Sequence, residues 1–434
     1  MANRVLKKIV FCVTAKLSSP LCISNGEGIL TDQDVIRDHD GNPFIPGSSL
    51  TGAMRGYLGA AGDNKCIFGY ADSGQDSGEM SSVFVSDLIF TSRVVSRVRD
   101  GVALSEYKTA RTGAKYDMEV IETGAEGYFF MELVIRERDR ETKMLEQIRQ
   151  VFNGWSRHEI RLGAKKTRGY GELDVLSVRS QVYSGANILK YADAYRITDG
   201  HSELPDVTQE WMETSGKEGI RYLTIEVPLR LAGGISIRQY AVKKGEPDFV
   251  HITIGEGKNR KAVIPGTSFA GAIRHRMAEI LSELGEKPED SQKLLDEIWG
   301  YVRAGADDRE EREESVKRQS EARRSAIVID ECILENARPL TMVRNGISRF
   351  EASARDGALF KERSYVGGTT TLMIRIKKQD QEEERRILDI LLPVLQDIRN
   401  GYLPVGGQTA VGRGIFCGNG RIRVDGRELE GEYA

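Results

Sequence analysis

The chain has 434 residues, 40% of them hydrophobic, and a formal net charge of −3 at pH 7. This length can bury the cores of two or three domains, and the near-neutral balance excludes steering toward nucleic acid by overall basicity. No apolar run of about 18 residues could span a membrane, and residues 1–10 lack the apolar stretch of a signal peptide, so we expect a cytoplasmic protein without a membrane partner.

The first half predicts alternating strands and helices. A strand is expected over residues 5–23, followed by a loop over 24–44. A helix is expected next, with Ser48 or Ser49 as its N-cap and Leu50, Met54, Tyr57 and Leu58 on its apolar face. Further strands are expected over 83–90, 127–135 and 172–178, with a second helix over 141–155. The resulting order is β-α-β-β-α-β, which is typical of the ferredoxin-like fold.

The second half repeats the first. Residues 45–55 (IPGSSLTGAMR) match 264–274 (IPGTSFAGAIR), and a glycine pattern at Gly163, Gly169 and Gly171 recurs at Gly406, Gly412 and Gly414. Strands are expected over 223–231, 326–334 and 369–377, with helices beginning at Phe269 and Glu382. The two motifs differ in offset, 219 against 243 residues, because the second copy gains residues on both sides of Gly300, partly in a charged run over 303–324. We read that run as a solvated surface segment.

The repeat divides the chain into domains. We predict a first domain over 1–180, a connector over 181–220 and a second domain over 221–434. Within each domain the segment between the second and third strands, 93–126 and 335–367, is too long for a plain hairpin turn. Such an insertion suggests a functional role.

Five cysteines are scattered through the chain, at positions 12, 22, 66, 332 and 417, without any Cys-x-x-Cys motif. Only five histidines are available to share ligand duty, so this spacing does not predict a zinc site. In a cytosolic protein such cysteines are expected to be free, buried thiols.

Two motifs could bind phosphate. The Pro-Gly-Ser-Ser turn opens a helix whose free N–H groups favour anions, beside hydroxyl groups and an arginine, although simple capping explains the serines equally well. The glycine loop over 163–171 combines flexible backbone with three cations and a tyrosine able to stack on a base, although a glycine turn can also be purely geometric. The candidate RNA contacts are Ser48, Ser49, Arg55, Lys165, Lys166, Arg168, Tyr170, Thr267, Ser268, Arg274 and Arg413.

The joint pattern resembles the RAMP (repeat-associated mysterious protein) superfamily of CRISPR systems, in particular the backbone subunits of type III effector complexes. The segment from Asp32 to Asp38, followed by Gly41 to Leu50, looks like that family's catalytic loop and signature helix, and 166–171 looks like its C-terminal glycine loop. The resemblance implies an α+β chain of two tandem ferredoxin-like, RRM-like RAMP domains with long thumb insertions. It also implies CRISPR RNA, target RNA and the other RAMP-family, small and large subunits of the complex as partners.

The resemblance implies catalytic residues as well. Asp32, three residues before Val35, corresponds to the aspartate that cuts target RNA, with Asp34 and Asp38 able to assist, and Mg²⁺ or another divalent cation would bind at Asp32. In the second copy Asp248 lies two residues before Val250, so it is a shifted catalytic aspartate or that half only binds, and His251 is a weaker helper.

Three alternatives stay open from the sequence. The main one is an RNA-binding and assembly subunit without catalysis. A nuclease that processes guide precursors is less favoured, because such enzymes commonly use histidine and neither signature turn contains one. A metabolic enzyme of ferredoxin-like fold comes last.

Overall fold

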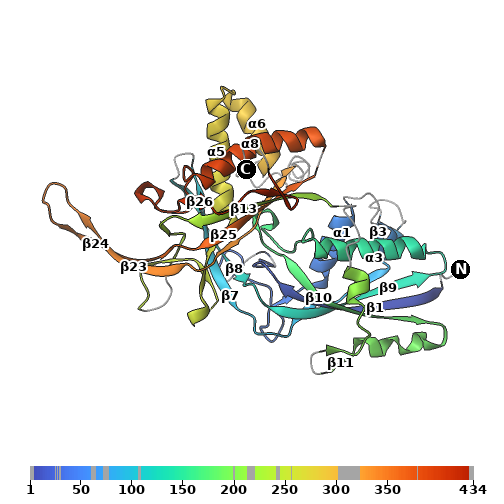
Figure 1. Cartoon of the computed structure of the whole chain (residues 1–434). Helices are drawn as coiled ribbons and strands as arrows, with labels where there is room; N and C mark the ends of the chain where they lie inside the picture. Colours follow the sequence, from blue (N-terminus) through green and yellow to red (C-terminus); the bar gives the residue numbers. More distant parts are fainter. Residues whose placement is uncertain are drawn as a thin grey trace, which may run out of the picture. The chain divides into compact units, whose positions relative to one another are not determined.

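The computed structural model describes residues 4–24, 26, 28, 31–59, 65–71, 78–105, 109–198, 201–212, 220–240, 245–255, 257–301, 323–378 and 380–429. The chain forms two compact units (Figure 1). Unit 1 comprises residues 1–101, 116–166 and 170–220, and unit 2 comprises 102–115, 167–169 and 221–434. Most of the charged run over 303–324 lies outside the described residues.

Unit 1 is built on an antiparallel sheet of order β10-β1-β9-β6-β2, with β5 also pairing with β9. Its strands are β1 (Val5–Leu17), β2 (Phe44–Ile45), β5 (Val83–Val85), β6 (Leu88–Phe90), β9 (Glu126–Arg136) and β10 (Leu173–Ser184). Helices α1 (Gly47–Gly59) and α3 (Glu141–Ser156) cover one face (Figure 1). The smaller elements are α2 (Lys65–Phe68), β3 (Tyr70–Ala71) and β4 (Gly78–Glu79), and η1 (Lys166–Arg168) begins at the last residue of this part of unit 1.

The core of unit 1 lies between that sheet face and the two helices. Phe11 and Phe129 from the sheet contact Phe152 and Trp155 of α3, and all four side chains are buried. Alternate residues of β1 point into this core, as the pleat of a strand requires. The helices α1 and α3 therefore confirm the apolar patterns seen in the sequence.

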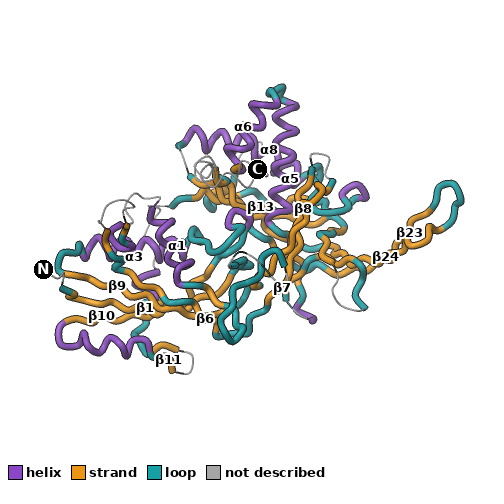
Figure 2. Tube along the Cα trace, turned by 180° about the vertical axis from the view of Figure 1, so that it is seen from behind, coloured by secondary structure: helices purple, strands orange, loops and turns teal. Residues whose placement is uncertain are grey.

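The segment over 181–220 packs on both faces of the same sheet. Its first part covers the face opposite the helices (Figure 2) and contains η2 (Gly185–Tyr195), β11 (Ile197–Thr198) and β12 (His201–Ser202). The short helix α4 (Thr208–Met212) lies on the helix side, where Trp211 packs against Phe11 and Phe152. Tyr195 donates a hydrogen bond from its hydroxyl to Glu132 of β9, and Lys8 of β1 lies over the ring of Tyr191. The aromatic side chains of this face are thus packed by the chain itself, so the segment is a second layer of unit 1 as well as a connector.

Unit 2 repeats the arrangement, with a sheet of order β21-β25-β13-β27-β28 in which β26 also pairs with β13. Its strands are β13 (Tyr222–Leu231), β21 (Ile327–Ile329), β25 (Thr369–Lys377), β26 (Phe416–Gly418), β27 (Arg423–Val424) and β28 (Arg427–Glu428). The principal helices are α5 (Gly266–Glu283), α6 (Pro288–Trp299) and α8 (Gln381–Arg399). Helix α6 and the longer α5 account for the residues gained before Gly300.

The remaining strands of unit 2 form smaller sheets beside the main one. These are β14 (Gly234–Ile235), β15 (Arg238–Tyr240), β16 (Phe249–His251), β17 (Thr253–Ile254), β18 (Lys261–Ile264), β19 (Gly300–Tyr301), β20 (Arg323–Arg324) and β22 (Cys332–Leu334), together with η3 (Gly257–Asn259) and η4 (Thr409–Val411).

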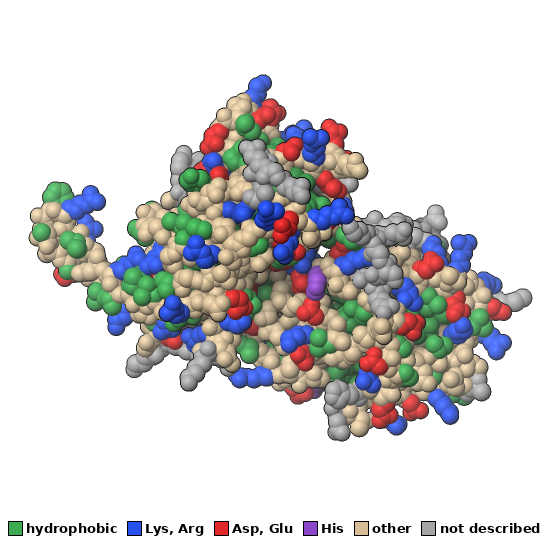
Figure 3. Space-filling model, viewed as in Figure 1, with side chains coloured by type: hydrophobic (Ala, Val, Ile, Leu, Met, Phe, Trp, Pro, Cys, Tyr) green, Lys and Arg blue, Asp and Glu red, His purple; other side chains and the backbone are tan. Residues whose placement is uncertain are grey.

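Both long insertions form antiparallel hairpins, as their length suggested. In the first copy these are β7 (Ser96–Leu104) and β8 (Ala110–Ile121). In the second they are β23 (Arg338–Ile347) and β24 (Ala354–Val366), whose distal part projects as an arm from unit 2 (Figure 1). Apolar side chains, including a fully exposed Phe350, and arginines lie along this arm (Figure 3).

Three sequence predictions need correction or completion. Helix α1 begins at Gly47, so Ser48 and Ser49 lie inside its first turn and neither is the N-cap. The strand expected over 83–90 is interrupted at 86–87, because the Asp87 carboxylate turns to accept the Gly47 N–H at 2.7 Å. Cys12, Cys22 and Cys332 are free and buried, as predicted. Cys417 is free but half-buried, and the side chain of Cys66 is not among those that the structure describes.

The mixed α+β class is confirmed. Assignment of the two main sheets to the ferredoxin-like type stays a prediction. No helix in the described part of the chain is long and apolar enough to cross a membrane.

Candidate functional site

A loop over residues 31–38, here called the first carboxylate loop, connects β1 to α1 and lies against β8. The Gln33 carbonyl accepts the Glu119 N–H at 2.9 Å, and the Glu119 carboxylate accepts the Val35 N–H at 3.0 Å. Arg37 donates to the other Glu119 oxygen at 2.5 Å. Backbone and side-chain bonds to one strand therefore hold the loop against the base of the β7–β8 hairpin.

Asp32 occupies the exposed edge of this contact. Its Oδ2 accepts the Asp117 N–H at 2.9 Å, and Asp117 Oδ1 accepts the Asp32 N–H at 3.0 Å. Among described residues Oδ1 of Asp32 accepts no hydrogen bond, and the residue is exposed. The reciprocal pair fixes the carboxylate while leaving one oxygen available to a ligand.

The side chains of Asp34 and Asp38 accept local hydrogen bonds that hold the conformation of the loop. Asp34 Oδ1 accepts hydrogen bonds from the Thr31 N–H at 2.9 Å and from its hydroxyl at 2.8 Å. Asp38 accepts the Asn42 and Asp40 N–H groups, and the bond from Asn42 is the main reason that the pKa of Asp38 lies below its ordinary value. Both carboxylates act as turn acceptors, a common use of aspartate.

Asp248 holds the equivalent place in unit 2. Its Oδ2 accepts the Lys361 N–H of β24 at 2.7 Å, and the residue is exposed. The pairs Leu21↔Ile121 and Ile235↔Tyr365 align the two hairpins at an offset of 244 residues (365 − 121), and Lys361 is 244 residues beyond Asp117 (361 − 117). The same strand position therefore binds each carboxylate.

The loop backbone agrees with this equivalence. Ile36 donates its N–H to the Ile23 carbonyl at 3.0 Å, and Ile252 donates to Ile237 at 3.0 Å. Ile252 lies 216 residues beyond Ile36 (252 − 36), the same spacing as Asp248 beyond Asp32 (248 − 32). The residue equivalent to Val35 is therefore His251 and not Val250, so the apparent one-residue shift of Asp248 was an error of alignment.

His251 is a structural residue. It is 2% exposed; its Nδ1 accepts the Ile237 N–H at 2.9 Å and its Nε2 donates to the Val263 carbonyl at 3.0 Å. Burial lowers the pKa of His251 to about 4, so it is neutral at physiological pH. An imidazole with both nitrogens engaged in the interior does not act as the catalytic helper that the sequence suggested.

A buried carboxylate, Glu362, forms a hydrogen-bond network beneath the loop that carries Asp248. Glu362 of β24 is fully buried and accepts hydrogen bonds from Ser236 at 2.6 Å, Gln408 at 2.8 Å and Arg238 at 3.1 Å. Burial alone would raise the pKa of Glu362, but these bonds and the Arg238 charge outweigh it and hold the pKa below its ordinary value. The Arg238 guanidinium also lies 4.4 Å from the ring centroid of Phe249, the residue after Asp248.

The first N–H group of helix α1 is already bound within the chain. The Gly47 N–H is bound to Asp87, so this group is not free for phosphate. Ser48 and Thr267 are exposed, and Ser49 and Ser268 are half-buried. Arg55 is exposed and donates a hydrogen bond to the Gly69 carbonyl at 3.3 Å, and Arg274 pairs with Asp296 at 3.2 Å. The exposed members of these predicted sets are therefore Ser48, Thr267 and Arg55.

The two glycine loops share one backbone conformation. Lys165 and Gln408, which are 243 residues apart, have positive φ angles of 56° and 59°. Lys165 Nζ lies 4.5 Å from the ring centroid of Tyr116, and Lys166 and Arg168 are exposed. In the glycine loop of unit 2, the Arg413 guanidinium packs against Gly234, where an added Cβ would lie 2.0 Å from a guanidinium nitrogen. Arg413 also donates a hydrogen bond to Met342 Sδ at 3.5 Å.

Tyr170 corrects a prediction. Its side chain is 6% exposed and packs with Cys22, Met118 and Val120, so the ring is not presented for stacking on a base. Its hydroxyl lies 3.5 Å from Arg99, which forms a buried ion pair with Glu122 at 2.9 Å. Tyr170 therefore anchors the glycine loop to the hairpin base.

Sequence reasoning missed the residues that hold the loops. Asp117 and Glu119 are two residues apart on β8 and so face the same side, a period-two acidic pattern that is visible in the sequence. Glu362 carries no comparable signal, since its three partners come from distant segments.

The fold and the loops define a duplicated α+β protein that presents one exposed carboxylate on the same loop of each unit. The family model of the RAMP superfamily matches residues 14–174 and 250–417, which together cover well over half of the chain. The chain therefore belongs to the RAMP superfamily, a family of CRISPR-associated proteins that work with RNA. Among curated proteins none matches this chain.

Proposed function

We propose that the chain is a CRISPR RNA-binding backbone subunit of a type III interference complex that cuts target RNA paired with the guide. Asp32 and Asp248 would be the catalytic carboxylates, one in each unit. The observation that carries the proposal is that both aspartates are exposed and accept an N–H from equivalent strand positions through one oxygen, while no described residue donates a hydrogen bond to the other oxygen.

The chemistry suits a carboxylate held in this way. When the ribose 2′-oxygen attacks the adjacent phosphorus, a 2′-O–P bond forms and the bond to the 5′-oxygen breaks, leaving a cyclic phosphate and a 5′-hydroxyl. The open oxygen of Asp32 or Asp248 accepts the 2′-hydroxyl proton, and water returns a proton to the leaving oxygen. A fixed loop keeps the carboxylate aligned for this transfer.

The residues present suit a divalent cation such as Mg²⁺ only in part. Asp32 and Asp117 offer the hard oxygen ligands that Mg²⁺ prefers, but in the described part of the chain no third carboxylate or histidine joins them. Phosphate oxygens and water would complete the coordination, and the bound ion would neutralise phosphate charge. Asp32 and Asp117 would hold it in unit 1.

The RNA would bind along basic and polar residues. The exposed ones are Ser48, Arg55, Lys166 and Arg168 in the first copy and Thr267 in the second, and the half-buried Lys165 and Arg413 add charge at the glycine loops. The β23–β24 arm adds arginines next to exposed apolar side chains, a combination that suits a nucleic-acid backbone and unstacked bases (Figure 3).

The second candidate is an RNA-binding and assembly subunit of the same kind of complex without catalysis. The presence of a carboxylate loop in both units favours the catalytic proposal, but an exposed aspartate bound to a strand N–H is also compatible with a purely structural loop. Both candidates involve guide RNA, target RNA and the other RAMP-family, small and large subunits.

The deciding experiment uses the reconstituted guide-loaded complex with Mg²⁺ and a labelled complementary RNA. Asp32→Asn, Asp248→Asn and the double variant are compared with Asp40→Asn, an exposed aspartate just beyond the first carboxylate loop and outside the proposed site. We expect each single variant to lose its own subset of cuts, the double variant to lose all cuts assigned to this chain, and target binding to stay within about twofold. Unchanged cutting by the double variant would establish the non-catalytic alternative.

A further inference from the structure

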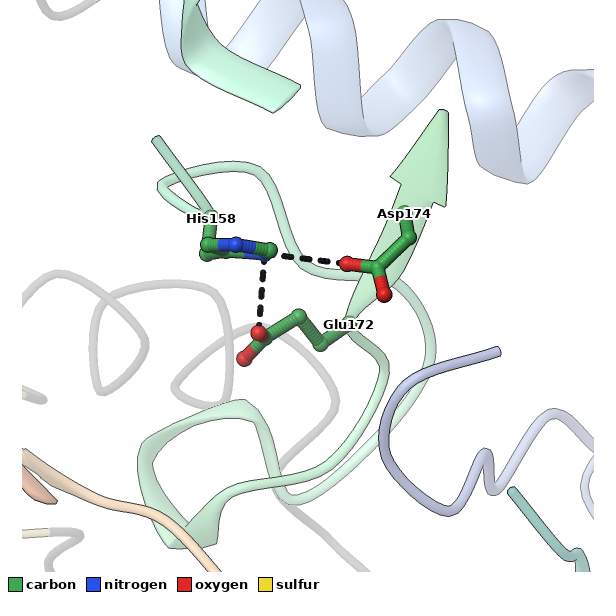
Figure 4. Close-up of side chains that lie close together, drawn as sticks. All are labelled: His158, Glu172 and Asp174. Atoms are coloured by element: carbon green, nitrogen blue, oxygen red, sulfur yellow. Dashed lines mark ion pairs between the residues drawn. The ribbon is translucent and has the colours of Figure 1, made fainter. Parts of the chain in front are cut away.

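One cluster of ligand-type side chains lies apart from the carboxylate loops. Glu172 and Asp174, at the start of β10, are two residues apart and face the same side of the strand. His158, just beyond α3, points its Nδ1 at both: the distances are 2.9 Å to Glu172 Oε1 and 3.4 Å to Asp174 Oδ1 (Figure 4). The three donor atoms lie within 4.8 Å of one another.

The backbone at His158 is unusual. Its φ of 56° lies in the left-handed region, which costs a residue with a Cβ about 1 kcal/mol. The equivalent residue of unit 2, 243 positions later, is Gly401, with a φ of 79° and the same helix-end bond, its N–H donating to Ile398 as that of His158 donates to Trp155. Unit 1 thus carries a histidine where its own repeat uses the glycine that this turn favours.

The carboxylates are also specific to unit 1. The positions equivalent to Glu172 and Asp174 are Ile415 and Cys417. The repeated fold therefore does not require these three side chains. Both carboxylates occur in the copy that carries the left-handed histidine.

We propose that His158, Glu172 and Asp174 bind a divalent transition-metal ion of the Zn²⁺ type. Imidazole nitrogen and carboxylate oxygen are typical Zn²⁺ ligands, and tetrahedral bonds of about 2.0 Å separate ligand atoms by about 3.3 Å, close to the distances observed. A proton on Nδ1 could make one good hydrogen bond, whereas two carboxylate oxygens face this nitrogen. A metal ion can bind the nitrogen and both oxygens at once.

The surroundings of the cluster fit this assignment. Arg161 binds the other Glu172 oxygen at 2.6 Å, which orients Oε1 toward His158 in the way that outer contacts orient metal ligands. Oδ1 of Asp174 is shielded from solvent and accepts no hydrogen bond within the described part of the chain. Three protein ligands leave a fourth position for water.

The ion would have a defined effect on the neighbouring loop. His158 and Glu172 flank the segment that contains the first glycine loop, residues 163–171. A metal bound between them closes the base of this segment, and so restrains the loop that carries Lys165 and Lys166. Because the ion binds the folded chain, it also stabilises unit 1 by mass action.

The test is calorimetric titration of the metal-free full-length protein with Zn²⁺, followed by thermal unfolding with and without the ion. We expect one ion per chain and a higher Tm with Zn²⁺. His158→Gly and Asp174→Asn should each weaken Zn²⁺ binding at least tenfold. His275→Ala removes a comparable imidazole–carboxylate pair on α5, with 3.0 Å between His275 and Glu279, and should leave binding unchanged.

The glycine variant keeps the test independent of folding defects, since glycine suits the left-handed turn. Without Zn²⁺ the Tm of His158→Gly should therefore fall only by the contribution of the two ion pairs that His158 makes with Glu172 and Asp174. The circular dichroism spectrum should match that of the parent protein. Equal Zn²⁺ affinity in the parent and in His158→Gly, or no saturable binding by the parent, would overturn the proposal and leave a proton-linked ion-pair cluster.

Discussion

Asp32 and Asp248 are bound by the same strand position in two different units: the Asp117 N–H holds one carboxylate and the Lys361 N–H holds the other. The loop spacing before each signature helix differs, with 15 residues from Asp32 to Gly47 and 18 from Asp248 to Gly266. The additional three residues lie after the aspartate, where unit 2 forms β17 and β18. The position of the carboxylate is therefore independent of the length of the segment that follows it.

We predict that Asp117 positions Asp32. Asp117→Ala removes the acceptor for the Asp32 N–H together with one of the two carboxylates proposed to hold Mg²⁺. The lost hydrogen bond alone, about 1 kcal/mol, corresponds to roughly fivefold in the cuts assigned to unit 1, so the loss should be at least that large. Asp117→Asn keeps the acceptor oxygen and should retain most of the activity. The measurement is single-turnover cleavage by the guide-loaded complex.

The matched control for this prediction is Lys361→Ala. Lys361 offers its backbone N–H to Asp248, so its side chain is not needed for that bond. The cuts assigned to unit 2 should persist at saturating target RNA. Equal cutting by Asp117→Ala and the parent protein would show that the reciprocal pair does not matter for the reaction.

We predict a large stability cost at Glu362. Glu362→Ala leaves the buried Ser236, the half-buried Gln408 and the partly exposed Arg238 without their acceptor, and removal of one member of such a network costs about 3 kcal/mol. Urea unfolding of the full chain, followed by hydrogen exchange of residues 249–264, measures it. Glu351→Ala, at the exposed end of the hairpin, should change stability by less than about 0.5 kcal/mol, and a similar effect of both changes would contradict the prediction.

The glycine loops allow a prediction about RNA affinity. Lys165→Gln introduces the residue that unit 2 uses at the same left-handed position, so the backbone should be preserved while a charge is lost. Lys166→Ala removes an exposed neighbouring cation. If each lysine contacts a phosphate, guide affinity should fall and the slope of log K against log salt should shrink by about 0.7 per lysine. An unchanged slope in both variants would exclude phosphate contact by these residues.

Much of the fold could be predicted from the sequence, but only part of the site. The 3.6-residue pattern of Met144, Ile148, Val151 and Phe152 is enough to predict α3, because burial of one helix face is a local property. The flanking motif predicts Asp32. Asp248 is predicted only as a shifted counterpart of Asp32, because a buried histidine occupies the place where the first copy has Val35, and such an exchange changes the residue type without changing the fold.

The contacts that hold the site could not be predicted, for a physical reason. The pairing of Asp32 with Asp117 spans 85 residues, and that of Asp248 with Lys361 spans 113. Each depends on the register between a loop and a hairpin strand, which the sequence of neither segment encodes alone. The same holds for His158, whose partners are brought close only when α3 packs on the sheet beside β10.

We finally predict that acid destabilises unit 2 through His251. Burial lowers the pKa of this side chain from 6.5 to about 4, so the folded state favours the neutral imidazole more than the unfolded state does. The resulting stabilisation is fully present above pH 6.5 and is lost as the pH falls toward 4, because the unfolded chain then gains a proton that the folded chain does not. The full effect is about 3 kcal/mol.

The measurement is the free energy of unfolding between pH 8 and pH 4, with hydrogen exchange of residues 249–264 as the local probe. His251→Gln retains a hydrogen-bonding side chain but does not titrate, so it should be less stable at pH 8 and should lose less stability on acidification. His39→Gln, at an exposed site in unit 1, should follow the parent protein. A parent protein and His251→Gln variant with parallel pH profiles would show that His251 is not the group responsible.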